Sequence, residues 1–128
     1  MPHLIVEYSA NLENKAEIPP LLEALVETAI ATGVFPRAGI RCRAHRCEHY
    51  HIADGNPGFA FLHLQAKIGA GRTEDQKETA SRAIFQALTD YMQPVYESQG
   101  LALSFEMTEL PVTLKYNHNN LRDYIGKG

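Results

Sequence analysis

The chain has 128 residues, of which 45% are hydrophobic and 21% charged, so we expect a single domain over residues 1–128 with its own core. No apolar run approaches the roughly 20 residues that cross a bilayer, and no basic stretch followed by an apolar one opens the sequence. We therefore expect a cytoplasmic protein with no membrane partner. The formal net charge of -3 argues against a general nucleic-acid partner.

The charge is unevenly distributed along the chain. Between residues 37 and 72, six basic and two acidic side chains give a balance of +4, whereas the remainder carries -7. A basic middle in an acidic body suits a small anionic ligand held in a local pocket, where the electric field is focused. Solvated strand edges would explain the same arginines equally well.

Residues 1–9, MPHLIVEYS, are typical of a strand that begins just after the initiator methionine. We expect Met1 to be removed, which would turn the Pro2 nitrogen into a free secondary amine. Leu4, Val6 and Tyr8 share the face of Pro2 at a period of two, so this amine would sit on a rigid element. Many chains begin with Met-Pro and use the proline for no chemistry.

The next segments predict a helix and a second strand. Apolar residues recur at helical spacing after the two prolines at 19 and 20, and Gly33 is typical of the position just after a helix ends. The predicted stripe consists of Ile18, Leu22, Leu25 and Ala29. Residues 40–50 alternate between small or apolar and basic side chains, which predicts a strand with one polar face.

The cysteines and histidines of this region do not form a metal motif. Cys42 and Cys47 are five residues apart on the predicted strand, so they point to opposite faces and neither a mutual disulfide nor a shared metal is expected. The histidines at 45, 49 and 51 have no second cluster at zinc-finger spacing, so we predict no metal site.

The second half repeats the pattern after a strong turn signal, ADGNPG, at residues 53–58. Residues 59–68 alternate as a strand, and Thr73 with Gln76 has the spacing of a helix capping box. Pro94 is expected to kink or shorten the last turns of that helix. The helix stripe is predicted at Ala80, Ile84, Ala87, Leu88, Tyr91 and Val95, and the final strand aligns Leu101, Leu103, Phe105 and Met107.

Two βαβ units in succession predict an α+β fold, a two-layer sandwich with four main strands and two helices on one face. The opposite sheet face is mixed in character, which favours burial against sister subunits. Residues from Val112 onward show no period and are expected either to form an arm that wraps a neighbour or to be a disordered tail.

Pro2 on a first strand, the doubled βαβ pattern, and the segments AGIRCRAH and KIGAGRT together resemble the tautomerase superfamily. Within it, the resemblance is closest to the 5-carboxymethyl-2-hydroxymuconate isomerases. It runs from PHLIVEYS to LALSFEMTELPVTLKYNHNN and so covers nearly the whole chain. Differences lie in HRCEHYHIADGNPG and beyond Asn120, where they bear on substrate preference.

The resemblance implies a homotrimer without metal or organic cofactor, and an isomerase in which Pro2 is the acid and base. The implied reaction converts 5-carboxymethyl-2-hydroxymuconate to 5-oxopent-3-ene-1,2,5-tricarboxylate in the breakdown of homoprotocatechuate. Arg41 in GIRCR and Arg72 in GAGRT fall at the arginines of the family, which implies that they bind the polycarboxylate substrate. From the alternation alone, Arg43 and His45 share the strand face of Arg41 and could line the pocket instead.

A free α-amine has a pKa of about 7.7 to 8.0, and apolar neighbours and guanidinium charges are expected to lower it toward neutrality. A guanidinium can grip a carboxylate through two hydrogen bonds and keeps its charge. Phe35, Phe59 and Phe61 have the spacing of pocket walls, and equally of core or interface residues. Two other readings stay open: a tautomerase acting on a smaller keto acid or a halogenated one, and a non-catalytic trimer that binds small anions.

Overall fold

The computed structural model describes residues 2–126 and contains one four-stranded sheet. Its strands are β1 (His3–Ser9), β2 (Arg41–Cys47), β3 (Ala60–Ile68) and β4 (Leu101–Glu109), in the spatial order β2-β1-β3-β4. β1 is parallel to β2, and β3 is parallel to β4, whereas the two halves meet through the antiparallel pair β1 and β3. The predicted pair of βαβ units is therefore confirmed.

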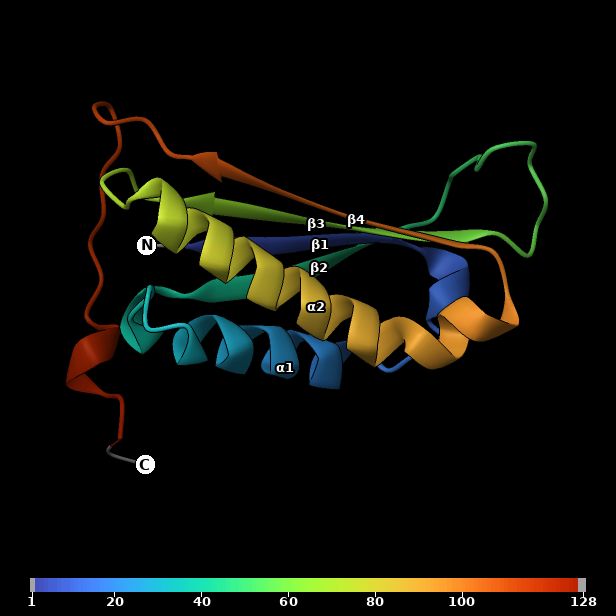
Figure 1. Ribbon diagram of the computed structural model, residues 1–128, viewed down its shortest axis with the longest axis horizontal. Coiled ribbons are helices and arrows are strands. Elements are labelled where there is room, and N and C mark those ends of the chain that lie inside the picture. The colour runs from blue at the N-terminus through green and yellow to red at the C-terminus, as the bar shows by residue number, and fades with distance from the viewer. Residues whose placement is uncertain (1, 127–128) are drawn as a thin grey trace.

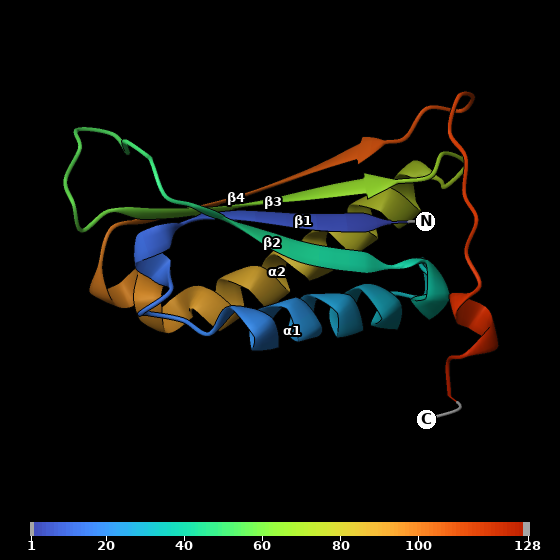
Figure 2. The ribbon, with the colours of Figure 1, turned by 180° about the vertical axis from the view of Figure 1, so that it is seen from behind.

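Both long helices cover the same face of the sheet, as Figures 1 and 2 show from opposite sides. They are α1 (Ile18–Ala31) and α2 (Glu74–Ser98), and short 3-10 turns lie at η1 (Ala10–Leu12), η2 (Arg37–Gly39) and η3 (Leu121–Asp123). The alternate residues of β3 that face the helices are buried, from Ala60 to Ile68, and they form the floor of the core. The α+β sandwich expected from the sequence is confirmed.

The sequence predicted most of the buried residues of the two helices, but a few predicted positions are wrong by one residue. On α1 both Leu25, as predicted, and Leu21 are fully buried, whereas the predicted Leu22 lies at the margin of the core. On α2 the buried stripe includes Met92, which the prediction omitted, while Ala87 and Tyr91 are only partly buried. The buried residues of α2 recur at every fourth position from Ala80 to Met92, and those of α1 at every third or fourth, as expected for an amphipathic helix on a core.

The ends of the helices agree better with the sequence, because they lie where the glycine and the capping box predicted them. Gly33 follows α1 with φ of +77°, a conformation that favours glycine, and its N–H donates to the Ile30 carbonyl. Thr73 and Gln76 form both hydrogen bonds of the capping box at the start of α2. Pro94 does not shorten α2, because the helix continues to Ser98, and buried Val95 keeps this last turn packed on the core.

The second strand is shorter than the predicted span of residues 40–50. Its last pair joins Cys47 to Ser9, and β1 ends at Ser9. Beyond that point β2 has no neighbouring strand to pair with, so residues 48–59 leave the sheet as the loop that projects from one end of the molecule in Figures 1 and 2.

The C-terminal segment lies against its own chain. Leu110 N–H donates to the Ile68 carbonyl at 2.7 Å, and Asn119 Nδ2 donates to the Ala38 carbonyl at 2.9 Å. Between these two anchors the segment crosses the end of the sheet where β1 begins (Figure 1). Within residues 2–126, no helix has both the length and the apolar content needed to span a bilayer.

Candidate active site

Pro2 lies at the start of β1, one of the two central strands, and its side chain is less than 2% exposed. Its carbonyl accepts a hydrogen bond from Arg41 N–H at 3.1 Å, which continues the parallel pairing of β1 with β2. On its other side, the pairing of His3 with Lys67 brings Pro2 beside the end of β3. Removal of Met1 concerns a residue outside those that the structure describes.

Arg72 lies at the same end of the sheet, because β3 ends at Ile68 and the loop from Gly69 leads directly to it. Its Nη1 donates to the Gly69 carbonyl at 3.1 Å and its Nε to the Val34 carbonyl at 3.3 Å. The guanidinium carbon stands 4.9 Å from the centre of the Phe35 ring, a cation–π distance. These contacts fix the guanidinium on the side of the sheet that carries the helices.

The backbone of Arg41 is close to Pro2, but the Arg41 side chain lies on the face of the sheet opposite the helices. Arg41 pairs with His3, and His3 belongs to the alternate set of β1 residues that stands opposite the buried Leu4 and Val6. Arg43 follows on the same outer face, where its Nη1 lies 3.0 Å from His3 Nδ1. Within one chain, the register therefore separates the side chains of Arg41 and Arg72 by the thickness of the sheet.

The electrostatic field at the start of β1 is positive. The pKa of His3 is lowered from its ordinary 6.5, first by burial and then by the nearby charges of Arg43, Arg41 and Lys67. The same positive charges would favour an anion at this end of the sheet. Sequence reasoning did not single out His3, although its position next to Pro2 was a signal.

The phenylalanines considered as pocket walls lie in three different places. Phe35 is buried under Arg72, and Phe61 stands on the outer sheet face. Phe59 lies at the far end, where its ring approaches Gly100. Only Phe35 therefore belongs to the end of the sheet that holds Pro2.

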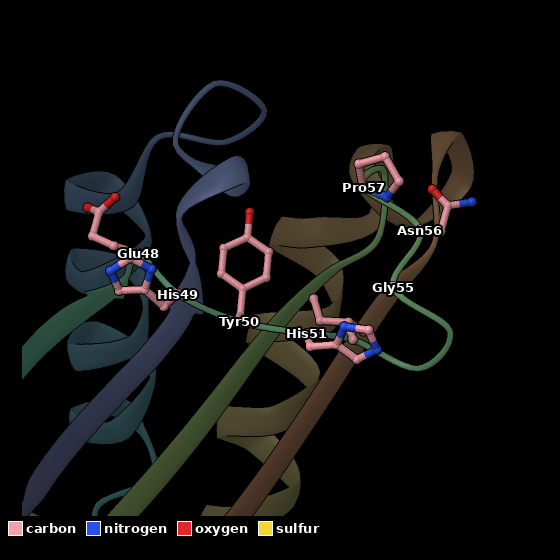
Figure 3. A pocket seen from close by; sticks show the side chains of 8 residues that line it. Glu48, His49, Tyr50, His51, Gly55, Asn56 and Pro57 are labelled. Atoms are coloured by element: carbon pink, nitrogen blue, oxygen red, sulfur yellow. The ribbon is translucent and has the colours of Figure 1, made fainter.

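A separate hollow lies in the loop between β2 and β3, at the opposite end of the sheet. Figure 3 shows it lined by Glu48, His49, Tyr50, His51, Gly55, Asn56 and Pro57. Neither Pro2 nor a buried charged group lines it. Within residues 2–126, no three histidine, cysteine or acidic side chains are gathered to hold a metal ion.

Comparison with known proteins decides the family. The model of the 5-carboxymethyl-2-hydroxymuconate isomerase family matches residues 2–125. The chain belongs to the 5-carboxymethyl-2-hydroxymuconate isomerase family. It is therefore an isomerase of the tautomerase superfamily, as the sequence resemblance implied.

Individual relatives agree with this assignment. The 5-carboxymethyl-2-hydroxymuconate Delta-isomerase of Escherichia coli is 41% identical over 121 residues, which cover 94% of this chain and 96% of the relative. The crystal structure of a 5-carboxymethyl-2-hydroxymuconate isomerase from Deinococcus radiodurans R1 is 39% identical, with a TM-score of 0.90 over 96% of this chain and 92% of that one.

A more distant solved structure shares the fold alone. It is described as a fused 4-OT wild type symmetric trimer and is 17% identical, with a TM-score of 0.58 over 92% of the isomerase and 94% of that chain. A shared fold at such low sequence identity agrees with the two-layer arrangement of the isomerase.

Proposed function

We propose that this isomerase converts 5-carboxymethyl-2-hydroxymuconate to 5-oxopent-3-ene-1,2,5-tricarboxylate in homoprotocatechuate breakdown, with the amine of Pro2 as acid and base. The observation that carries the proposal is the burial of Pro2 immediately before β1. The electrostatic field there is positive, and the loop that leads to Arg72 lies at the same end of the sheet. The family match supports the substrate, because the Escherichia coli relative is named for it.

The proposed reaction moves one proton and shifts a double bond. The neutral amine takes the proton of the substrate hydroxyl, which leaves a conjugated enolate and a protonated proline. The protonated proline then returns the proton to a carbon further along the conjugated system, so that a ketone forms and the amine is regenerated. No electrons enter or leave, and no cofactor takes part in these steps.

Burial of Pro2 supports this role, since an apolar environment and nearby cations disfavour the protonated amine. A neutral amine at physiological pH can act as the base. Arg72 is proposed to hold a substrate carboxylate and to stabilise the enolate, because its guanidinium is fixed by two carbonyls and the Phe35 ring.

Arg41 is proposed to bind substrate in an assembled homotrimer. Its side chain stands on the outer face of the sheet with His3, and no helix within residues 2–126 covers this face. If three copies pack through this face, each Arg41 would approach the site of a neighbouring copy. We propose such a homotrimer of single-domain chains of residues 1–128, located in the cytoplasm.

The test uses processed protein whose mass shows that Met1 is absent. We expect it to isomerise the hydroxymuconate faster than a simple keto acid, with an ionisation between about pH 5 and 8 in the profile of kcat/KM against pH. Pro2→Ala, which replaces the ring by a primary amine, should reduce kcat at least about tenfold. Equal activity of Pro2→Ala and wild type, or a flat profile, would overturn the role of Pro2.

Arg72 is tested in the same assay. Arg72→Ala should raise KM or depress kcat at least about tenfold, because both the carboxylate contact and the enolate stabilisation are removed. Arg82→Ala is the matched control, since Arg82 is an exposed arginine on α2 that pairs with Glu78. An unchanged Arg72→Ala enzyme would remove Arg72 from the site.

A further inference from the structure

We infer that Lys115 is a further substrate-binding residue, which holds one of the carboxylates of the polycarboxylate substrate beside Arg72. Sequence analysis gave Lys115 no role, because it lies in a segment without any period. The inference rests on the proposed function for the identity of the substrate, and on the following geometry for the site.

The C-terminal segment brings the Lys115 ammonium to the loop after β3. A methyl group built on Gly69 would lie 3.6 Å from Lys115 Nζ and 3.7 Å from Arg72 Nη1. Both cationic nitrogens thus border one small space that Gly69 leaves without a side chain. Figure 1 shows the C-terminal segment crossing this end of the sheet, where β1 also begins.

Neither cation is neutralised by a carboxylate in the part of the chain that the structure describes. Arg72 donates only to the neutral carbonyls of Val34 and Gly69, and no acidic side chain pairs with Lys115. The nearby acid Glu109 instead pairs with Lys77 at 3.7 Å. Two like charges held near each other are unfavourable alone, and a bound anion with more than one carboxylate relieves their repulsion.

The exposed segment that carries Lys115 is anchored at both of its ends. Leu110 is bonded to Ile68, and Asn119 is bonded to Ala38, so the segment between them is tied across the end of the sheet. This arrangement fits a side chain that selects among substrates. A monocarboxylate can be held by Arg72 alone, whereas a polycarboxylate gains an additional contact with Lys115.

The experiment compares wild type, Lys115→Gln, Lys115→Arg and the control Lys15→Gln, a change at an exposed lysine in the loop between η1 and α1. Inhibition by propane-1,2,3-tricarboxylate and by acetate is measured beside KM and kcat for the hydroxymuconate. Lys115→Gln should raise KM and the tricarboxylate inhibition constant about tenfold, which corresponds to one charge-assisted hydrogen bond. In Lys115→Gln, the inhibition constant of acetate and kcat should stay within about threefold of the wild-type values. Lys115→Arg should restore most of the affinity for the tricarboxylate.

Two outcomes separate this inference from the proposed function. If wild type turns over the hydroxymuconate and Lys115→Gln behaves like Lys15→Gln, the role of Lys115 is overturned and the function stands. If wild type turns over nothing, calorimetry with propane-1,2,3-tricarboxylate decides the site independently. Binding that weakens in Lys115→Gln but not in Lys15→Gln would then support the anion site while the proposed function fails.

Discussion

At the scale of single residues, the pKa of His3 is a measure of the electrostatic field near the amine of Pro2. Burial and the charges of Arg43, Arg41 and Lys67 lower the pKa of His3 below its ordinary 6.5, because each disfavours the protonated imidazole. The unfolded chain binds this proton near pH 6.5 and the folded chain only at lower pH. Protonation of His3 therefore costs the folded chain more than the unfolded one, so the free energy of unfolding is highest above pH 6.5 and decreases as the pH falls through the lowered pKa of His3.

The prediction is a His3 titration midpoint below 6.5 in an NMR experiment on the folded protein. Arg43→Ala should raise this midpoint, because it removes a cation whose nitrogen lies 3.0 Å from the imidazole. Arg82→Ala, on the exposed side of α2, serves as the control and should leave it unchanged. A midpoint above 6.5 would mean that the positive field at the start of β1 is absent.

At the scale of elements, the start of α2 depends on a local motif that also positions Arg72. The Thr73 hydroxyl accepts from Gln76 N–H, and the Gln76 side chain accepts from Thr73 N–H. Because Arg72 immediately precedes this cap, a frayed first turn would also loosen the guanidinium.

Thr73→Ala should lower the free energy of unfolding by about 1 kcal/mol, the usual cost of losing a helix N-cap. Urea unfolding followed by circular dichroism, at one fixed protein concentration, measures the change. Thr79→Ala is the matched control, because Thr79 is an exposed residue inside the same helix and alanine favours a helix interior. Equal stability of Thr73→Ala and wild type would show that the capping box contributes nothing.

At the scale of the whole molecule, the outer sheet face and the C-terminal segment both present apolar side chains to solvent in the single chain. Ile5 and Phe61 stand half-buried on the outer face, and Val112, Leu114 and Tyr116 are 79%, 85% and 90% exposed on the segment. Burying these groups between copies would be favourable, which fits the proposed homotrimer. The arm that wraps a neighbour stays a prediction.

Sedimentation should therefore give a particle with the mass of three 14.3-kDa chains. Ile5→Lys should dissociate it, because a charge would be forced into the centre of the interface beside Arg43. The dissociated chain should also lose activity, since Arg41 would no longer reach a neighbouring site. Ala31→Lys, at the exposed end of α1, is the control that should keep three chains together; a wild type that sediments as one chain would contradict the assembly.

Sequence alone determined the order of the elements, the two βαβ units, the capping box at Thr73 and the glycine that follows α1, because these depend on periodicity and on neighbours a few residues away. It also indicated Pro2, Arg41 and Arg72 through the family resemblance. Only the tertiary structure decided where β2 ends, on which face of the sheet Arg41 stands, and that Lys115 comes to rest beside Arg72. The physical reason is that strand pairing and the path of an aperiodic segment depend on contacts between residues far apart in the chain.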